Sequence, residues 1–218
     1  MKLVTGATGH VGNVLVRELL SRGEAVRALV LPGDDCEALD ALDIPRCTGS
    51  VLDPASLDCA MAGVDTVYHL AGIISIMPGT ESLMRRVNVE GVRNVTEAAL
   101  RNDVSRMVHV SSIHAFERMP DGVEIDEVTP LALSKTAGSY DETKAQGTVA
   151  VLDAVKRGLD AVIACPTAII GPYDFRLSML GKALMDFAKR RLHLLVPGAY
   201  DFVDVRDVVT GLILAGER

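Results

Sequence analysis

The chain has 218 residues, enough for one domain with a large buried core. Hydrophobic residues make up 49% of it and aromatic residues only 4%, so we expect an aliphatic core of the kind that surrounds parallel strands covered on both faces. The net charge of -7 argues against sequence-independent binding to nucleic acid or to an anionic membrane, because both need basic patches.

The first predicted strand, 2–5, leads into a glycine-rich turn and then a helix. Gly6, Gly9 and Gly12 are spaced three residues apart, and apolar residues follow at helical period. The N-terminus of such a helix can hold a pyrophosphate, because its free backbone N–H groups and the helix dipole favour an anion. Glycine suits these positions because a Cβ would block the turn, the ligand or the helix–strand contact. The spacing G-x-x-G-x-x-G meets the dinucleotide fingerprint only in part, and an ordinary turn before an amphipathic helix is the alternative.

A second strand is predicted over 25–31, and its carboxyl end is where an acidic side chain would hold the adenosine ribose of NAD. Asp34 and Asp35 lie just beyond this end, and no basic residue stands between Arg27 and Arg46 to accept the 2′-phosphate of NADP. The pattern therefore favours NAD over NADP. The alternative interpretation is that both aspartates are solvated loop residues.

Strand and helix patterns alternate along the rest of the chain. Further strands are predicted over 44–51, 64–70, 104–110 and 161–164. Helices are predicted over 54–63, 81–102, 139–157 and 177–190, with a short apolar segment at 193–196 and a last helix after 202–207. This alternation implies a doubly wound parallel sheet with helices on both faces, which binds ligands at the carboxyl ends of its strands. Since no internal repeat or linker is present, we expect 1–218 to form one domain.

Two further features of this pattern bear on a site. The segment 113–138 has no clear periodicity, and a connection of this length is usually functional, so we expect it to form part of the wall of a substrate pocket. His69 closes the fourth predicted strand. It is interpreted as a buried structural residue, because the sequence offers no partner for it.

Tyr140 and Lys144 form a Y-x-x-x-K pattern that places both side chains on one face of a predicted helix. A free tyrosine is a weak base at neutral pH, but an ammonium group within about 4–6 Å lowers the pKa of a phenol. Tyr140 could then exchange a proton with a substrate hydroxyl or carbonyl, and Lys144 could reach the hydroxyls of the nicotinamide ribose. Ser112, at the end of the fifth predicted strand, could hydrogen bond to the same substrate oxygen. Alone, Y-x-x-x-K is a weak pattern, and its alternative is a surface tyrosine beside a solvated lysine.

Together these motifs resemble the short-chain dehydrogenase/reductase superfamily, specifically its extended branch of NAD-dependent epimerase/dehydratase-like proteins and, within that branch, the dihydroflavonol-reductase-like enzymes. Six stretches carry the resemblance and span nearly the whole chain: 5–12 (TGATGHVG), 87–91 (VNVEG), 110–112 (VSS), 140–144 (YDETK), 166–172 (PTAIIGP) and 202–208 (FVDVRDV). The resemblance implies a Rossmann-type fold, in which 166–218 contributes the start of a substrate-binding lobe.

The resemblance also implies a catalytic set and a cofactor site. The catalytic residues are Ser112, Tyr140, Lys144 and, as a helper near the active site, Asn88. The residues that hold NAD or NADP are Gly6, Thr8, Gly9, His10, Val11, Gly12, Leu31, Val51, Leu70, Ala71, Gly72, Val110, Tyr140, Lys144, Pro166 and Thr167.

Three departures from the family pattern affect what the resemblance implies. Ser50 stands where many relatives have an aspartate for the adenine amine, so base recognition is expected to depend on backbone groups. Leu31 replaces the arginine with which reductase-like relatives hold the 2′-phosphate, which weakens the case for NADP. Extended-branch proteins usually run well past 218 residues, so we expect a truncated chain or a minimal substrate lobe.

Three functions fit the pattern. The first is an NAD(P)-dependent oxidoreductase that interconverts a small-molecule carbonyl and alcohol by hydride transfer, with Tyr140 handling the proton. The second is a nucleotide-sugar epimerase or dehydratase, in which the cofactor is oxidised and reduced within one turnover. The third is a dinucleotide-binding regulatory protein without turnover, although such members of the superfamily typically lack the tyrosine–lysine pair.

The remaining expectations concern location and assembly. No run of 18 apolar residues is present and the N-terminus enters the first strand directly, so we expect neither a membrane span nor a signal peptide. The four cysteines show no C-x-x-C spacing, which fits reduced thiols in a cytoplasmic protein, and the scattered histidines predict no metal cluster. The resemblance implies a homodimer built from the helices that contain Asn88 and Tyr140.

Overall fold

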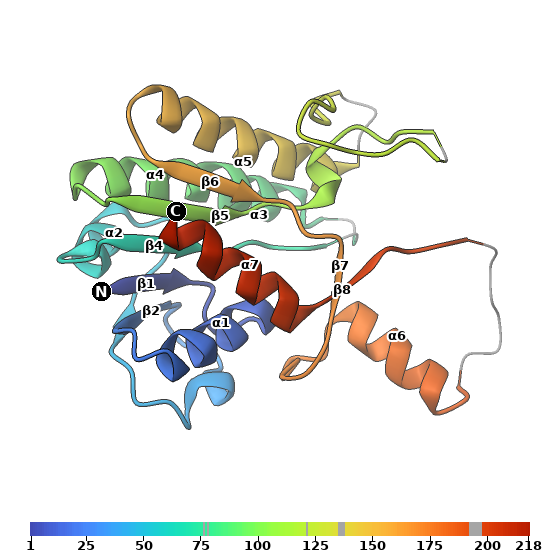
Figure 1. Cartoon of the computed structure of the whole chain (residues 1–218), viewed down its shortest axis with the longest axis horizontal. Helices are drawn as coiled ribbons and strands as arrows, with labels where there is room; N and C mark the ends of the chain where they lie inside the picture. The colour runs from blue at the N-terminus through green and yellow to red at the C-terminus, as the bar shows by residue number, and fades with distance from the viewer. Residues whose placement is uncertain (76, 78, 121, 135–137, 192–197) are drawn as a thin grey trace.

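The computed structural model describes the whole chain except residues 76, 78, 121, 135–137 and 192–197 (Figure 1). Six parallel strands form one sheet in the order β3-β2-β1-β4-β5-β6. The strands are β1 (Lys2–Thr5), β2 (Val26–Val30), β3 (Arg46–Thr48), β4 (Thr66–His69), β5 (Arg106–Val110) and β6 (Ala161–Ala164). The strand order changes direction between β1 and β4, which makes the carboxyl ends of these two strands the expected ligand crevice.

Helices cover both faces of this sheet, so the predicted doubly wound fold is confirmed. On one face α1 (His10–Ser21) packs against α7 (Val205–Glu217). On the other face α4 (Val92–Arg101) packs between α2 (Pro54–Met61) and α5 (Ser139–Lys156) (Figure 1). Among the described residues, no helix is both long and apolar enough to cross a membrane.

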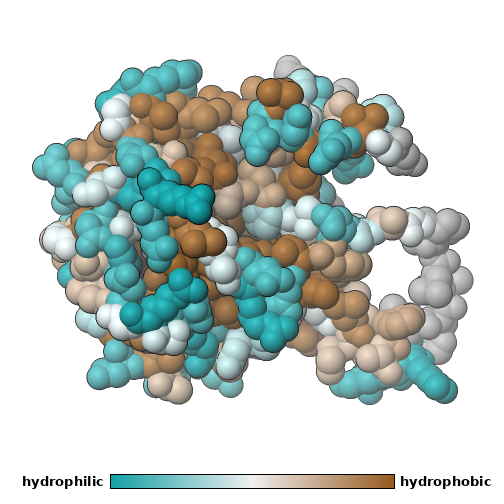
Figure 2. Space-filling model, viewed as in Figure 1, coloured by the Kyte–Doolittle hydropathy of each residue, from teal (hydrophilic) through white to brown (hydrophobic). Residues whose placement is uncertain are grey.

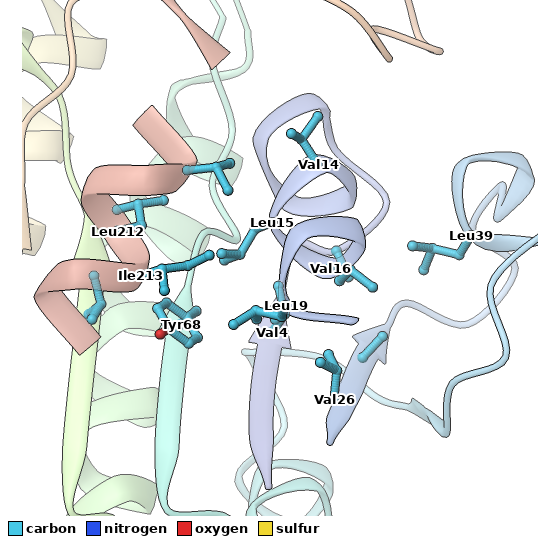
Figure 3. Packing of buried hydrophobic residues seen from close by; sticks show 14 of the residues in the cluster. Val4, Val14, Leu15, Val16, Leu19, Val26, Leu39, Tyr68, Leu212 and Ile213 are labelled. Carbon is cyan, nitrogen blue, oxygen red and sulfur yellow. The ribbon is translucent and has the colours of Figure 1, made fainter. Parts of the chain in front are cut away.

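Alternation along the strands explains why both faces of the sheet are buried. In β1, Leu3 contributes to the cluster beneath α2 and α4, whereas its neighbour Val4 contributes to the cluster beneath α1 and α7. In β4, Tyr68 faces the same side as Val4. Figure 3 shows Tyr68 in the packing between α7 and α1. Successive residues of a strand point to opposite faces, so continuous apolar strands supply two cores at once.

The long helix predicted over 81–102 is a continuous helical run with a π-helical segment inside it. The run consists of α3 (Glu81–Arg85), the π-helical η2 (Arg86–Gly91) and α4. At this segment α5 approaches closely, because a Cβ on Gly147 would lie 2.4 Å from the carbonyl oxygen of Asn88. Single π-helical turns are frequent at functional sites, and this one carries Asn88.

Some elements are shorter than predicted. The third strand covers only Arg46–Thr48 of the predicted 44–51, because Gly49 donates its last ladder bond to Val30 before the chain turns at Ser50. The segment 113–138 contains the short 3₁₀ helix η3 (Ile113–Ala115) and an isolated antiparallel bridge between Phe116 and Leu131.

The C-terminal part adds a second, two-stranded parallel sheet that the sequence pattern did not indicate. It pairs β7 (Ala168–Ile170) with β8 (Phe202–Asp204), and α6 (Met179–Ala188) lies between them in the chain. The predicted apolar segment 193–196 lies outside the described residues.

In Figure 1 the arrowheads of β1 and β6 point toward the part of the chain that contains β7, β8 and α6, and Figure 2 shows hydrophobic atoms exposed beside it. Large exposed apolar side chains here include Met179, Phe187, Tyr200 and Phe202.

Candidate active site

The glycine turn after β1 is shaped by close backbone contacts. Gly6 adopts a φ of 71°, and a Cβ built on it would lie 2.7 Å from the backbone nitrogen of Ala71, at the end of β4. A Cβ on Gly12 would lie 2.1 Å from the carbonyl oxygen of Gly6. Gly6 therefore allows the turn to approach the end of β4, and Gly12 allows α1 to pack against the turn.

Gly9 and the first turn of α1 leave room for an anion. A Cβ on Gly9 would meet only the Gly6 carbonyl oxygen, at 3.3 Å, and the residue caps α1 in an extended conformation. Among the described residues, no side chain caps this end of the helix, and its first turn carries no acidic residue. The backbone N–H groups of His10, Val11 and Gly12 therefore remain for a ligand, and these residues fit the diphosphate of a dinucleotide.

The end of β2 is tied to this turn through Asp34. The hydroxyl of Thr8 donates to Asp34 Oδ2 at 2.7 Å. Leu31, at the end of the strand, leaves 53% of its surface exposed. Asp34 is therefore a carboxylate held beside the glycine turn rather than a freely solvated loop residue. This is the placement expected of a group that receives the adenosine ribose hydroxyls of NAD.

Asn88 holds the segment that follows β4. Its amide Nδ2 donates to Ile73 O at 2.9 Å, and its Oδ1 accepts from Ile73 N at 2.8 Å. Nδ2 also donates to the hydroxyl of Thr143 on α5 at 3.2 Å. A Cβ on Gly72 would lie 3.3 Å from Asn88 Oδ1 and 3.9 Å from Lys144 Nζ. Asn88 thus positions the backbone on the floor of the crevice, opposite Lys144.

Ser112 and Tyr140 meet at the end of β5. Ser112 caps η3, its side-chain oxygen accepting from His114 N at 3.2 Å, and it hydrogen bonds with Tyr140. Burial raises the pKa of the Tyr140 phenol; the Ser112 hydrogen bond opposes this rise, and the Asp141 charge adds to it. The expectation that Lys144 lowers this pKa is wrong for the structure, because burial raises the pKa and the opposing effect comes from Ser112.

Lys144 reaches the same edge of the sheet from α5. Its ammonium Nζ donates to Val110 O at 3.0 Å. Burial lowers the pKa of Lys144 to about 8, and the nearby Cys165 thiol acts in the opposite direction. Gly6 contacts Ala71, and the next residue, Gly72, faces Lys144. Close backbone contacts therefore link the glycine turn, through Ala71 and Gly72, to Lys144.

The model of the NAD-dependent epimerase/dehydratase family matches residues 2–218. The chain belongs to this family. The chain is 43% identical over 216 residues to "Sterol demethylase protein B" of Methylococcus capsulatus, covering 99% of this chain and 66% of that protein. It is 35% identical over 236 residues to "Cinnamoyl-CoA reductase 1" of Oryza sativa subsp. japonica, covering 99% of this chain and 67% of that protein. The crystal structure of gox2253 matches with a TM-score of 0.93 and 34% identity, covering 100% of this chain and 66% of that one. The family resemblance inferred from the motifs is confirmed, and the chain spans about two thirds of the length of these relatives.

Other residues assigned to the cofactor site lie at the same strand ends but differ in role. Val51 is buried, and its Cγ2 would lie 2.8 Å from a Cβ on Gly91, so its side chain belongs to the core. Pro166 accepts a hydrogen bond from Ile113 N at 3.1 Å and thereby joins the end of β6 to η3. Pro166 and Thr167 also line a cavity of about 450 Å³ between the end of β6 and α7.

His69 is a structural residue, as interpreted from the sequence. Its Nδ1 hydrogen bonds with the Thr5 hydroxyl at 2.7 Å, and its ring stacks on that of His109 with centroids 5.2 Å apart. Burial lowers the pKa of His69 to about 3, and the Lys144 charge contributes. Burial, and then the neighbouring His69 and Lys144, hold the pKa of His109 well below its ordinary value. Both rings are therefore neutral at physiological pH.

Two polar residues beside Tyr140 were not indicated by any motif. The His114 ring lies edge-on to the Tyr140 ring, with centroids 5.6 Å apart. Its Nδ1 hydrogen bonds with Asp141 Oδ1 at 3.0 Å, and Arg118 approaches the other oxygen of this carboxylate at 3.6 Å. Their sequence positions, two residues after Ser112 and one after Tyr140, are the signal that could have identified them.

The shifted pKa of Lys144 predicts a pH dependence of stability. Between about pH 8 and pH 10.5 the unfolded chain keeps a proton that the folded protein has released, so rising pH favours the folded state. We expect the free energy of unfolding of the wild type to rise, relative to that of Lys144→Met, across this window. Urea unfolding of both proteins at several pH values measures the difference, with Lys156→Met on exposed α5 surface as the matched control. Parallel curves for wild type and Lys144→Met would contradict the burial of this charge.

Proposed function

We propose that the protein is an NAD(P)-dependent oxidoreductase that interconverts a small-molecule carbonyl and an alcohol. The observation that carries this proposal is the convergence of Ser112, Tyr140 and Lys144 on the crevice that begins at the glycine turn. A non-catalytic dinucleotide-binding protein has no need for a lysine and a tyrosine that are both partly desolvated at the end of β5. Placing these groups in the interior costs stability, and such costs concentrate at functional sites.

The chain's own residues would hold the cofactor along the carboxyl edge of the sheet. The N–H groups of His10, Val11 and Gly12 would bind its diphosphate, and Asp34 would bind the adenosine ribose. Lys144 faces Gly72, where its ammonium would reach the nicotinamide ribose hydroxyls. When bound, the nicotinamide would supply or accept the hydride.

Tyr140 would provide the proton. Because burial raises its pKa above the ordinary value, the phenol is protonated at neutral pH and suits the role of general acid toward a substrate carbonyl. Ser112, which hydrogen bonds with Tyr140, would bind the same substrate oxygen and orient it. In the reverse reaction the phenol would first have to lose its proton, which its raised pKa opposes at neutral pH.

Two candidate reactions remain to be separated. The family description names epimerases and dehydratases, whereas the rice relative is named as a reductase. Carbonyl reduction consumes NADH or NADPH steadily, whereas epimerisation and dehydration return the cofactor to its starting state. We expect a screen of ketones and aldehydes to give loss of absorbance at 340 nm in proportion to the alcohol formed. Conversion of a nucleotide sugar with no net change in the cofactor would favour the alternative reaction.

Three further proposals concern the oligomeric state, the cellular location and the segment that binds the substrate. The homodimer implied by the family would use the helical run that contains Asn88 (α3, η2 and α4) together with α5, which leaves Leu152 and Val155 exposed on its surface. All four cysteines are free thiols, which supports a reducing compartment such as the cytoplasm. The segment 166–218 would begin the substrate-binding lobe, which fits the apolar side chains exposed beside β7 and β8.

A further inference from the structure

A segment distant in sequence crosses the dinucleotide-binding turn. It follows β7 and comprises residues 172–176. His10 Nε2 hydrogen bonds with Pro172 O at 2.9 Å, and Asn13 Nδ2 donates to Tyr173 O at 3.1 Å. The guanidinium of Arg17 lies over the Tyr173 ring, 4.7 Å from its centroid. These contacts fix the segment against the first turns of α1, where the diphosphate is proposed to bind.

The last residue of this segment reaches the end of β2. Arg176 Nη2 donates to Asp34 Oδ1 at 2.7 Å and to Asp35 O at 2.9 Å. The other carboxylate oxygen of Asp34 accepts from Thr8. The loop after β2 has no basic residue of its own near Asp34. Arg176, 142 residues further along the chain, therefore supplies the positive charge there.

Arg176 has hydrogen-bonding capacity beyond these two contacts. A guanidinium carries five N–H donors, and both bonds use Nη2 alone. Among the described residues, Nε and Nη1 have no hydrogen-bond partner, and 48% of the side chain is exposed. A free N–H of this charged guanidinium can donate a charge-assisted hydrogen bond to a phosphate oxygen while Nη2 stays on Asp34 and Asp35.

We propose that Arg176 is the residue that lets the adenosine end of the site accept the 2′-phosphate of NADP, while Asp34 receives the ribose hydroxyls of NAD. This inference rests on the proposed dinucleotide site. The ion pair between the two side chains offsets the repulsion that Asp34 would exert on a phosphate. The site therefore binds both cofactors, and the balance between them depends on Arg176 rather than on the end of β2, where Leu31 provides no charge.

The test uses adenosine fragments, so that it depends on neither the nicotinamide nor turnover. Binding of adenosine 2′,5′-bisphosphate and of ADP to the whole chain is measured by isothermal titration, for the wild type and for Arg176→Leu. We expect Arg176→Leu to weaken binding of the 2′-phosphate compound about tenfold or more, the loss typical of a charge-assisted hydrogen bond, and to change ADP binding less than about twofold. Arg176→Lys keeps the charge but not the planar set of donors, so it is expected to weaken binding of the 2′-phosphate compound less than Arg176→Leu does.

Matched controls separate the possible outcomes. Arg22→Leu removes an exposed ion pair with Glu18 at the opposite end of α1 and is expected to affect neither ligand. Equal weakening of both ligands by Arg176→Leu, at an unchanged melting temperature, would overturn the inference, because Arg176 would then only hold the segment in place. Unchanged binding of both would overturn it as well. Failure of the wild type to bind either fragment would instead contradict the dinucleotide site itself, and the inference with it.

Discussion

Replacement of Tyr140 by phenylalanine is expected to lower turnover about 10²- to 10⁴-fold while leaving cofactor binding within about twofold of the wild type. The change removes only the phenolic oxygen, which hydrogen bonds with Ser112 at the end of β5. Burial keeps this hydroxyl protonated, so its loss removes the proton donor for the substrate oxygen. The ring itself, and its contact with His114, would remain. Stopped-flow measurement of cofactor oxidation under single-turnover conditions gives the rate of the chemical step directly.

The matched control is Tyr68→Phe, which removes a phenolic oxygen from the core between α1 and α7, beside Gly216 near the end of α7. It is expected to leave both turnover and cofactor binding unchanged. An equal loss of turnover in both variants would show that the effect of Tyr140→Phe is not specific to the crevice. If Tyr140→Phe retained full activity, another group would have to supply the proton, and His114 would be the first candidate because it lies beside the same ring.

The second large effect is expected from Gly12→Ala. The added methyl group would lie 2.1 Å from Gly6 O and 2.8 Å from Ala7 Cα, and these are backbone atoms that cannot rotate away. We expect the free energy of unfolding to fall by about 1–3 kcal/mol, the range typical of overpacked sites. Because α1 must shift relative to the turn, cofactor affinity should fall as well. Thermal unfolding and an NAD titration measure the two effects.

The same substitution elsewhere is expected to have the opposite sign. Gly211 lies inside α7, and a Cβ built on it meets nothing within 4 Å. Gly211→Ala should therefore stabilise the protein by about 0.5–1 kcal/mol, because alanine has the higher helix propensity. A stable Gly12→Ala variant with normal affinity for NAD would contradict the role given to the contact between α1 and the turn.

The local sequence predicts the parts of this site whose residues are neighbours in the chain. Glycines at fixed spacing after a strand indicate the turn, and Y-x-x-x-K on a helix indicates the pair of Tyr140 and Lys144. Residues that follow different strands could be predicted to lie close together, because parallel strands have their carboxyl ends at one edge of the sheet. For the same reason Ser112 and Gly72 could be assigned to the crevice before their distances were known.

Features that depend on contacts between distant segments left no such pattern. The contact of Arg176 with Asp34 spans 142 residues, so nothing near either residue indicates it. The π-helical turn at Asn88 lies where Gly147 approaches closely from another helix, and neither local sequence indicates this contact. The raised pKa of Tyr140 reflects burial by the whole fold, whereas the motif suggested only its neighbour Lys144. These are properties of packing, and a single sequence does not specify them.

A crystal structure of the protein grown with NADH would test the central claim most directly. The diphosphate is expected on the backbone N–H groups of His10, Val11 and Gly12, with the nicotinamide ribose at Lys144 and the ring beside the Tyr140 phenol. A dinucleotide bound with its nicotinamide away from Tyr140, or with its diphosphate away from the start of α1, would contradict the assignment of this crevice as an oxidoreductase active site.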